Sequence, residues 1–349
     1  MSGDLERRYR RVLRLLPRWY REQWEQDMVA AFLDGWLTGD PEADDYISVA
    51  AGPGWAEIAS VVGLAVRLHL GGPGTPRRHA WGQAIRRAVL AVLLMHAVLA
   101  VDVLVSLVWR HRLVGWLPAP PGSVVVAPTG VWATVYCLVS AAWVVVFLTL
   151  ALRDYRTARV LGALCVVPGL IALLQAHFTG MLPAPFGPWV FWVMVDLAPV
   201  LAMAAFHPDA PPVARRPWLL ALPAGCVLVY GPVLALQLTD NVAWLPDFSG
   251  LCCILAALAC LVHAPRAWSR RAAGSGLWSL TLVLLAAVAG AYRLVSLTDF
   301  LDDPHLTAVS LAELLILLAA VALVAPDAAR AQTAAATPAP PLRPNAVAG

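Results

Sequence analysis

Four ionisable residues lie inside long apolar segments of the chain. They are Asp102, Asp196, Arg293 and Glu313. A charge near the centre of a bilayer costs about 2.5–3.5 kcal/mol on insertion scales, so each group should pair with another or line a polar cavity. When the segments are threaded through a membrane, all four residues fall in its outer half. We therefore expect one intramembrane polar cluster built from four helices.

This cluster has two interpretations. In the first it is a structural clamp, in which Arg293 pairs with one carboxylate and the others are neutral or face water. In the second, three carboxylates around one arginine line a cavity open to the outside. Such a cavity would bind a cation, relay protons or present Arg293 to an anionic headgroup or a polyprenyl phosphate.

Other residue types that often do chemistry form no recognisable site. His96 and Asp102 are six positions apart, which places them on largely opposite faces of one helix and not at a metal-pair spacing. No phosphate-binding loop, zinc-protease motif or nucleophile elbow occurs, and the six cysteines form no CxxC pair. The sequence therefore predicts no catalytic residue, no metal site and no cofactor.

The composition restricts the class of protein. Of 349 residues, 60% are hydrophobic and 13% are charged, the net charge is +3 and the mean hydropathy is +0.70. A soluble domain carries about 25% charged residues. These values exclude a soluble globular protein, a disordered chain and a nucleic-acid binder, and they leave a multi-pass membrane protein.

The elements that must hold the polar residues are eight apolar segments of spanning length. We place them near 88–108, 131–152, 160–178, 188–206, 218–238, 249–264, 277–297 and 306–325. The predicted fold class is an all-α polytopic helical bundle with a small N-terminal helical module. The predicted domains are a prefix module at 1–75, a basic linker at 76–87, a transmembrane domain at 88–325 and a disordered Ala/Pro-rich tail at 326–349.

Arginine distribution indicates the orientation, since loops on the cytoplasmic side carry an excess of basic residues. The loops that follow the second, fourth and sixth segments are basic, whereas the next loop in each case lacks arginine. The basic residues are Arg153, Arg156, Arg159, Arg215, Arg216, Arg266, Arg270 and Arg271. Arg110 and Arg112 are exceptions. The pattern predicts a multi-pass protein of the plasma membrane with both termini on the cytoplasmic side.

The first 75 residues have the pattern of three amphipathic helices. The first carries a candidate membrane-surface basic face, which consists of Arg7, Arg8, Arg10, Arg11 and Arg14. The second is acidic and aromatic. Three interpretations remain open: the two helices pair and neutralise each other, the first helix lies on an anionic membrane surface with its Leu and Tyr residues in the interface, or the aromatic face of the second helix binds a cytoplasmic protein partner.

The N-terminal segment resembles a known module. The runs Leu5–Tyr9, Leu15–Arg21 and Trp55–Ala59, together with Met28 and Phe32, are similar to the permease-prefix helical module (HAAS-like) of bacterial multi-pass membrane proteins. The resemblance covers about 70 residues and implies a cytoplasmic regulatory or docking element. Export permeases with this prefix carry a large extracytoplasmic domain, and this chain has no loop long enough for one, so permease activity is not implied.

Three functional hypotheses follow. The first is a non-enzymatic membrane anchor or signalling protein that recruits a cytoplasmic partner through residues 1–75. The alternative is a small-solute or lipid transporter that uses Asp102, Asp196, Arg293 and Glu313. A membrane enzyme is the weakest hypothesis, because no nucleophile or metal cluster has a usable spacing. The expected partners are the lipid bilayer and this cytoplasmic protein, not nucleic acid.

Overall fold

The structure, a computed structural model, describes residues 3–36, 52–71, 80–110, 131–179, 187–207, 210–238, 247–269, 275–298 and 301–336. Within these ranges the secondary structure is helical throughout and no strand occurs, as the all-α prediction requires. The helices are α1 (Gly3–Leu13), α2 (Arg18–Trp36), α4 (Trp55–His69), α5 (Ala80–Arg110), α6 (Val131–Ala151), α7 (Tyr155–Phe178), α8 (Gly187–Ala202), η1 (Met203–Ala205), α9 (Arg215–Leu238), α10 (Phe248–Trp268), α11 (Ser275–Leu297) and α12 (Pro304–Ala336).

Each of the eight predicted apolar segments overlaps one helix of the series α5 to α12. By length and composition, five stretches within the described residues are long and apolar enough to cross a membrane. These are Ala80–Val105, Tyr155–Gln175, Ser249–Trp268, Ser275–Leu297 and Pro304–Gln332. Cys137–Ala151 and Val195–Ala205 are apolar but shorter. Five spanning helices are thus supported, and eight remain a prediction.

Two predicted boundaries differ from the structure. Helix α5 begins at Ala80, inside the predicted linker at 76–87. The first turns of α5 pack against other residues. Ala84 is fully buried, and Arg86 Nη1 donates to the carbonyl of Ala205 over 3.2 Å. Helix α12 continues to Ala336, past the predicted start of the tail at 326. Alanine is the strongest helix former, so an Ala-rich segment extends a helix that packing already holds.

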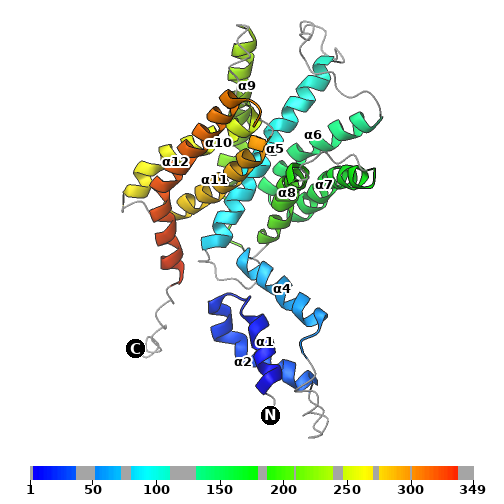
Figure 1. The fold of residues 1–349 in the computed structure, drawn as a ribbon, viewed down its shortest axis with the longest axis vertical. Coiled ribbons are helices and arrows are strands. Elements are labelled where there is room, and N and C mark those ends of the chain that lie inside the picture. The colour runs from blue at the N-terminus through cyan, green and yellow to red at the C-terminus, as the bar shows by residue number, and fades with distance from the viewer. Residues whose placement is uncertain are drawn as a thin grey trace, which may run out of the picture. The chain divides into compact units, whose positions relative to one another are not determined.

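The chain divides into two compact units, one formed mainly by Met1–Gly82 and the other by Gln83–Phe206 and Pro211–Ala331. In the first unit α1, α2 and α4 enclose a shared apolar core (Figure 1). Leu5 and Leu13 of α1 are fully buried, and Tyr9 stacks on Phe32 of α2 with ring centroids 4.0 Å apart. Burial, and after it the negative charge of Glu57, raises the pKa of Tyr9.

The apolar face of α1 is therefore occupied by its own module. Leu5, Tyr9, Leu13 and Leu16 are at most 6% exposed, so the interpretation that they insert into the membrane interface is wrong for this packing. On the other side of α1, Arg10 lies 2.7 Å from Glu6 and 3.8 Å from Glu25 of α2. Some charge pairing between the two helices thus occurs, and a membrane-surface role for the arginines stays a prediction.

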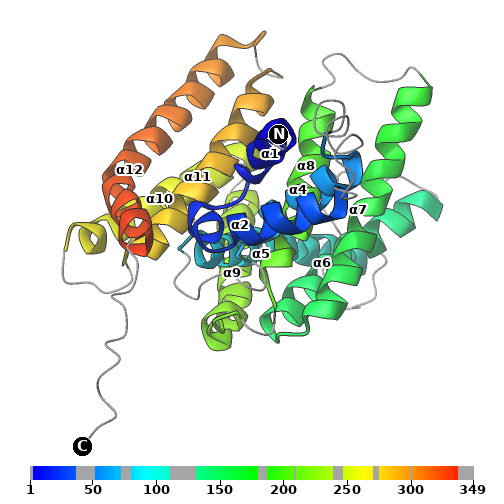
Figure 2. The same ribbon diagram turned by 90° about the horizontal axis from the view of Figure 1, so that it is seen from below.

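The second unit contains two apolar cores. One is formed by α5, α6, α7 and α8, with Leu93, Val146 and Phe147 fully buried. The other is formed by α10, α11 and α12, with Cys260 and Val324 fully buried. In both views α6, α7 and α8 lie on one side of α5, and α10, α11 and α12 lie on the other (Figures 1 and 2).

Candidate functional site

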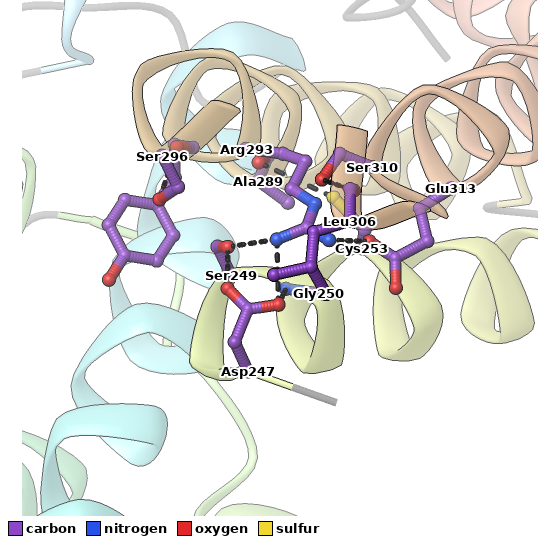
Figure 3. Close-up of polar contacts among 11 residues, drawn as sticks. Asp247, Ser249, Gly250, Cys253, Ala289, Arg293, Ser296, Leu306, Ser310 and Glu313 are labelled. Carbon is purple, nitrogen blue, oxygen red and sulfur yellow. Dashed lines mark hydrogen bonds and ion pairs between the residues drawn. The ribbon is translucent and has the colours of Figure 1, made fainter. Parts of the chain in front are cut away.

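Arg293 is the centre of a polar cluster where three helices meet. It lies one turn before the end of α11, close to the start of α10 and to the first third of α12 (Figure 3). Its side chain is 3% exposed. A buried guanidinium needs anionic or hydrogen-bonding partners, because its desolvation is otherwise uncompensated.

The partners come from both neighbouring helices. Nη1 of Arg293 donates to Oδ1 of Asp247 over 2.6 Å and to Oγ of Ser249 over 2.7 Å. Nη2 lies 2.6 Å from Oε2 of Glu313 on α12. Ser249 in turn donates to the other oxygen of Asp247. One arginine thus ties α11 to both α10 and α12.

Local sequence explains why Asp247 points at Arg293. Asp247 is the N-cap of α10, and its carboxylate accepts from the backbone N–H of Gly250 over 3.3 Å. An N-cap carboxylate is held by the orphan amides of the first helical turn and by the positive end of the helix dipole. This arrangement fixes the carboxylate before it meets the arginine, so α10 presents a preoriented anion.

The cluster holds one guanidinium and two carboxylates. The side chain of Glu313 is 12% exposed, and that of Asp247 is 38% exposed. Arg293 contacts both carboxylates, the more buried one of Glu313 and the more exposed one of Asp247, each at 2.6 Å. Charge balance and packing together make this a three-helix clamp, with a surplus of one negative charge when both acids are ionised.

Gly250 lies against this clamp. A Cβ added there would lie 2.7 Å from Oε1 of Glu313 and 3.0 Å from Oδ1 of Asp247. We expect Gly250→Ala to push the Glu313 carboxylate off Arg293 and to lower the free energy of unfolding by about 1–3 kcal/mol. Gly231→Ala is the control, since nothing lies within 4 Å of a Cβ there. Thermal unfolding of both variants in one detergent measures the difference. Equal unfolding temperatures would contradict the contact.

Asp196 does not join this cluster. Its Oδ1 lies 3.0 Å from Nε2 of His96, which joins α8 to α5. The other ring nitrogen of His96, Nδ1, lies 2.9 Å from the carbonyl of Val92, and the ring contacts Trp143 with centroids 4.8 Å apart. The intramembrane acids therefore separate into at least two sites.

The polar contacts of His96 indicate which of its ring nitrogens carries a hydrogen. A carbonyl oxygen only accepts, so Nδ1 carries a hydrogen and donates to Val92. Nε2 then faces the carboxylate of Asp196.

This assignment is measurable. We expect 15N-histidine NMR of the full chain at neutral pH to show a protonated Nδ1 at His96, with His96→Gln identifying the resonance. Asp196→Asn should leave that Nδ1 proton in place, because the Val92 carbonyl is unaffected. An unprotonated Nδ1 in the unmodified chain would contradict the hydrogen bond to Val92.

The fourth predicted cluster residue cannot be compared with the others. Asp102 lies within α5, but its side chain is outside the described residues. Of the predicted set, the structure brings together Arg293 and Glu313, and it separates Asp196 from them. Sequence analysis missed Asp247 and Ser249, which precede the apolar part of α10. The signal that could have identified Asp247 is an Asp placed immediately before a helical segment, as an N-cap requires.

A second polar cluster lies toward the other end of the α10–α12 bundle. Ser279 of α11 is fully buried, and its hydroxyl donates to Oδ2 of Asp327 over 2.8 Å. Nε2 of His263 lies 3.1 Å from that hydroxyl and 3.2 Å from the carbonyl of Ser275. Asp327 also lies 3.5 Å from Arg330. Asp327 falls in the predicted tail, so this cluster was not foreseen.

The second cluster contains Ser, His and Asp but does not have the geometry of a nucleophile. A catalytic serine donates its proton to the histidine. Here the hydroxyl donates to Asp327, so it accepts from Nε2 of His263, and the imidazole has no lone pair directed at it. The cluster links α10, α11 and α12 by hydrogen bonds and is structural.

Metal binding has no support in the part of the chain that the structure describes. No group of three or more His, Cys, Asp or Glu residues there is arranged to hold a metal ion. Comparison of the chain with protein-family models, curated proteins and solved structures gives no match.

Proposed function

We propose that this chain is a non-enzymatic protein of a bacterial cell membrane, in which a helical body anchors a cytoplasmic docking module. The observation that carries the proposal is that Arg293 and Asp196, which lie inside apolar helices, are paired with other side chains of this chain. Arg293 is engaged by two carboxylates and a serine hydroxyl, and Asp196 is engaged by His96. Groups that are already paired hold helices together, and they leave little free for a substrate.

The finer topology belongs to the same proposal. Eight spans with both termini in the cytoplasm are supported by a helix at every predicted apolar segment and by the excess of arginine in alternate loops. On this topology the module at residues 1–75, the linker and the C-terminal segment share the cytoplasmic side. The resemblance to the permease-prefix module supports a regulatory or docking role for the module.

A transporter is the second candidate, and one observation favours it. Two carboxylates contact a single guanidinium, and the side chain of Asp247 is 38% exposed. Surplus negative charge beside an apolar span attracts a cation or a proton. In this proposal Glu313 exchanges Arg293 for the transported ion, and the polar cluster, not the module, carries the activity.

Complementation separates the two candidates. The gene is removed from the native host, and the trait that changes is scored after return of the full chain or of single variants. Leu13→Asp disrupts the module, whereas Glu313→Gln keeps the size of the side chain and removes its charge. The docking proposal predicts that Leu13→Asp behaves like the deletion and that Glu313→Gln restores the trait.

The reverse pattern would overturn docking and favour transport. Membrane abundance of every variant is measured in parallel, so that loss of the protein is not mistaken for loss of activity. Leu15→Asp is the matched control for the module, because Leu15 is 50% exposed and Leu13 is fully buried.

A further inference from the structure

Helix α4 has two apolar faces, and its own module covers only one of them. Val61, Ala65 and Leu68 are between 1% and 7% exposed and belong to the core shared with α1 and α2. On an adjacent side of the helix Trp55 is 87% exposed, Val62 is 40% exposed and Val66 is 51% exposed. We call Trp55, Val62 and Val66 the outer stripe of α4.

The outer stripe has helical spacing. Its members are seven and four residues apart, so they lie one above another along one side of the helix, and exposed Ala59 falls between them. A contiguous exposed apolar stripe marks a candidate interaction surface, whereas scattered apolar side chains do not. The stripe is a continuous surface about two to three turns long.

The charged residues of α4 and of the segment after it indicate which kind of surface the outer stripe binds. The acidic residue of α4, Glu57, lies on the module side of the helix, where it acts on Tyr9. The basic residues Arg67 and His69 lie in the last turn, where both are exposed. Arg77 and Arg78 follow in the sequence. From residue 58 to residue 79 the chain thus holds basic residues and no acidic one, and a basic segment next to a membrane span matches an anionic lipid surface.

The chain itself keeps α4 close to such a surface. Residues 72–79 connect α4 to α5, whose Ala80–Val105 stretch is long and apolar enough to span. At no more than about 3.5 Å per residue over the eleven steps from His69 to Ala80, the chain holds the end of α4 within about 40 Å of the start of that span. Helix α1 cannot take the same role, because its apolar face is buried in the module.

We propose that α4 lies flat on the cytoplasmic lipid surface, with the outer stripe in the interface. Trp55 suits this position, because indole rings favour the boundary between headgroups and acyl chains. The ligand of this surface is the bilayer that the same chain spans. The proposal requires a membrane-spanning body, and it does not depend on the module binding a protein.

Collision of a nitroxide with two relaxing agents tests the proposal on the full chain in nanodiscs. A keto amino acid labelled with a nitroxide replaces Val62, which leaves the native cysteines in place. The matched control position is Ser60, which is exposed and points away from the stripe. Oxygen concentrates in lipid, and a nickel chelate stays in water. The lipid is a mixture of phosphatidylglycerol and phosphatidylcholine, or phosphatidylcholine alone.

The expected result is an oxygen-to-nickel accessibility ratio severalfold higher at position 62 than at position 60, and lower at 62 without the anionic lipid. A label at Val66 should repeat the result, which guards against a local disturbance at one position. If both agents are excluded from position 62, protein covers the stripe; the lipid proposal is then overturned and the docking proposal is strengthened. If nickel reaches 62 as readily as 60, the stripe faces water and the lipid proposal is overturned.

Discussion

Arg293→Gln is expected to lower the free energy of unfolding by about 3–5 kcal/mol, because it leaves two carboxylates without their cation in an apolar bundle. Glu313 carries most of this cost, since its side chain is only 12% exposed. Chemical or thermal unfolding of the full chain in detergent micelles measures the effect. The unmodified protein and the variant are compared in the same detergent, so that the micelle contributes equally to both.

The charge balance of the cluster makes the outcome asymmetric. Glu313→Gln removes a surplus charge and retains an acceptor for Arg293, so it should cost much less than Arg293→Gln. Arg330→Gln is the control for loss of an arginine, because the Arg330 side chain is 53% exposed and its partner Asp327, 3.5 Å away, keeps the hydrogen bond from Ser279. If Arg293→Gln costs no more than Arg330→Gln, Arg293 is not a buried clamp.

Leu13→Asp is expected to unfold the N-terminal module and to leave the helical body folded. Leu13 lies in the apolar core of the module, where its side chain is 0% exposed. A carboxylate placed there has no cation to pair with, and its burial costs several kcal/mol, about as much as a small domain has to lose. Limited proteolysis of the full chain reports the result as rapid cleavage within residues 1–71.

Leu15→Asp provides the matched comparison, because it adds the same charge to an exposed position two residues away. It should leave the module resistant to protease. The unfolding temperature of the body should be unchanged in both variants, since the two units have separate cores. Equal protease sensitivity of the two variants would mean that α1 does not pack as described.

The helices themselves could be predicted from the sequence, and the contacts between them could not. Hydrophobic run length places a helix at each apolar segment, because a segment of that length and composition has no other way to satisfy its backbone in lipid. Run length gives depth but not rotation about the helix axis. Asp196 and Glu313 have similar predicted depths, yet one faces His96 and the other faces Arg293.

The site residues that sequence analysis did not identify lie mainly outside the predicted apolar segments. Asp247 precedes its predicted span at 249–264, and Asp327 follows its predicted span at 306–325, so neither was counted as an intramembrane group. Both complete polar clusters that bury Arg293 and Ser279. Clusters of this kind use the helix ends, where N-cap residues and long side chains bring charge to the edge of the apolar region.

The most direct test of the account is a set of double-mutant cycles on unfolding free energy. The account holds that the intramembrane charges form separate pairs and not one shared site. It predicts coupling of about 0.5–3 kcal/mol between Arg293 and Glu313 and between His96 and Asp196, and coupling near zero between Arg293 and Asp196. Strong coupling between Arg293 and Asp196 would contradict it, because that result requires the single polar cluster that a transport site needs.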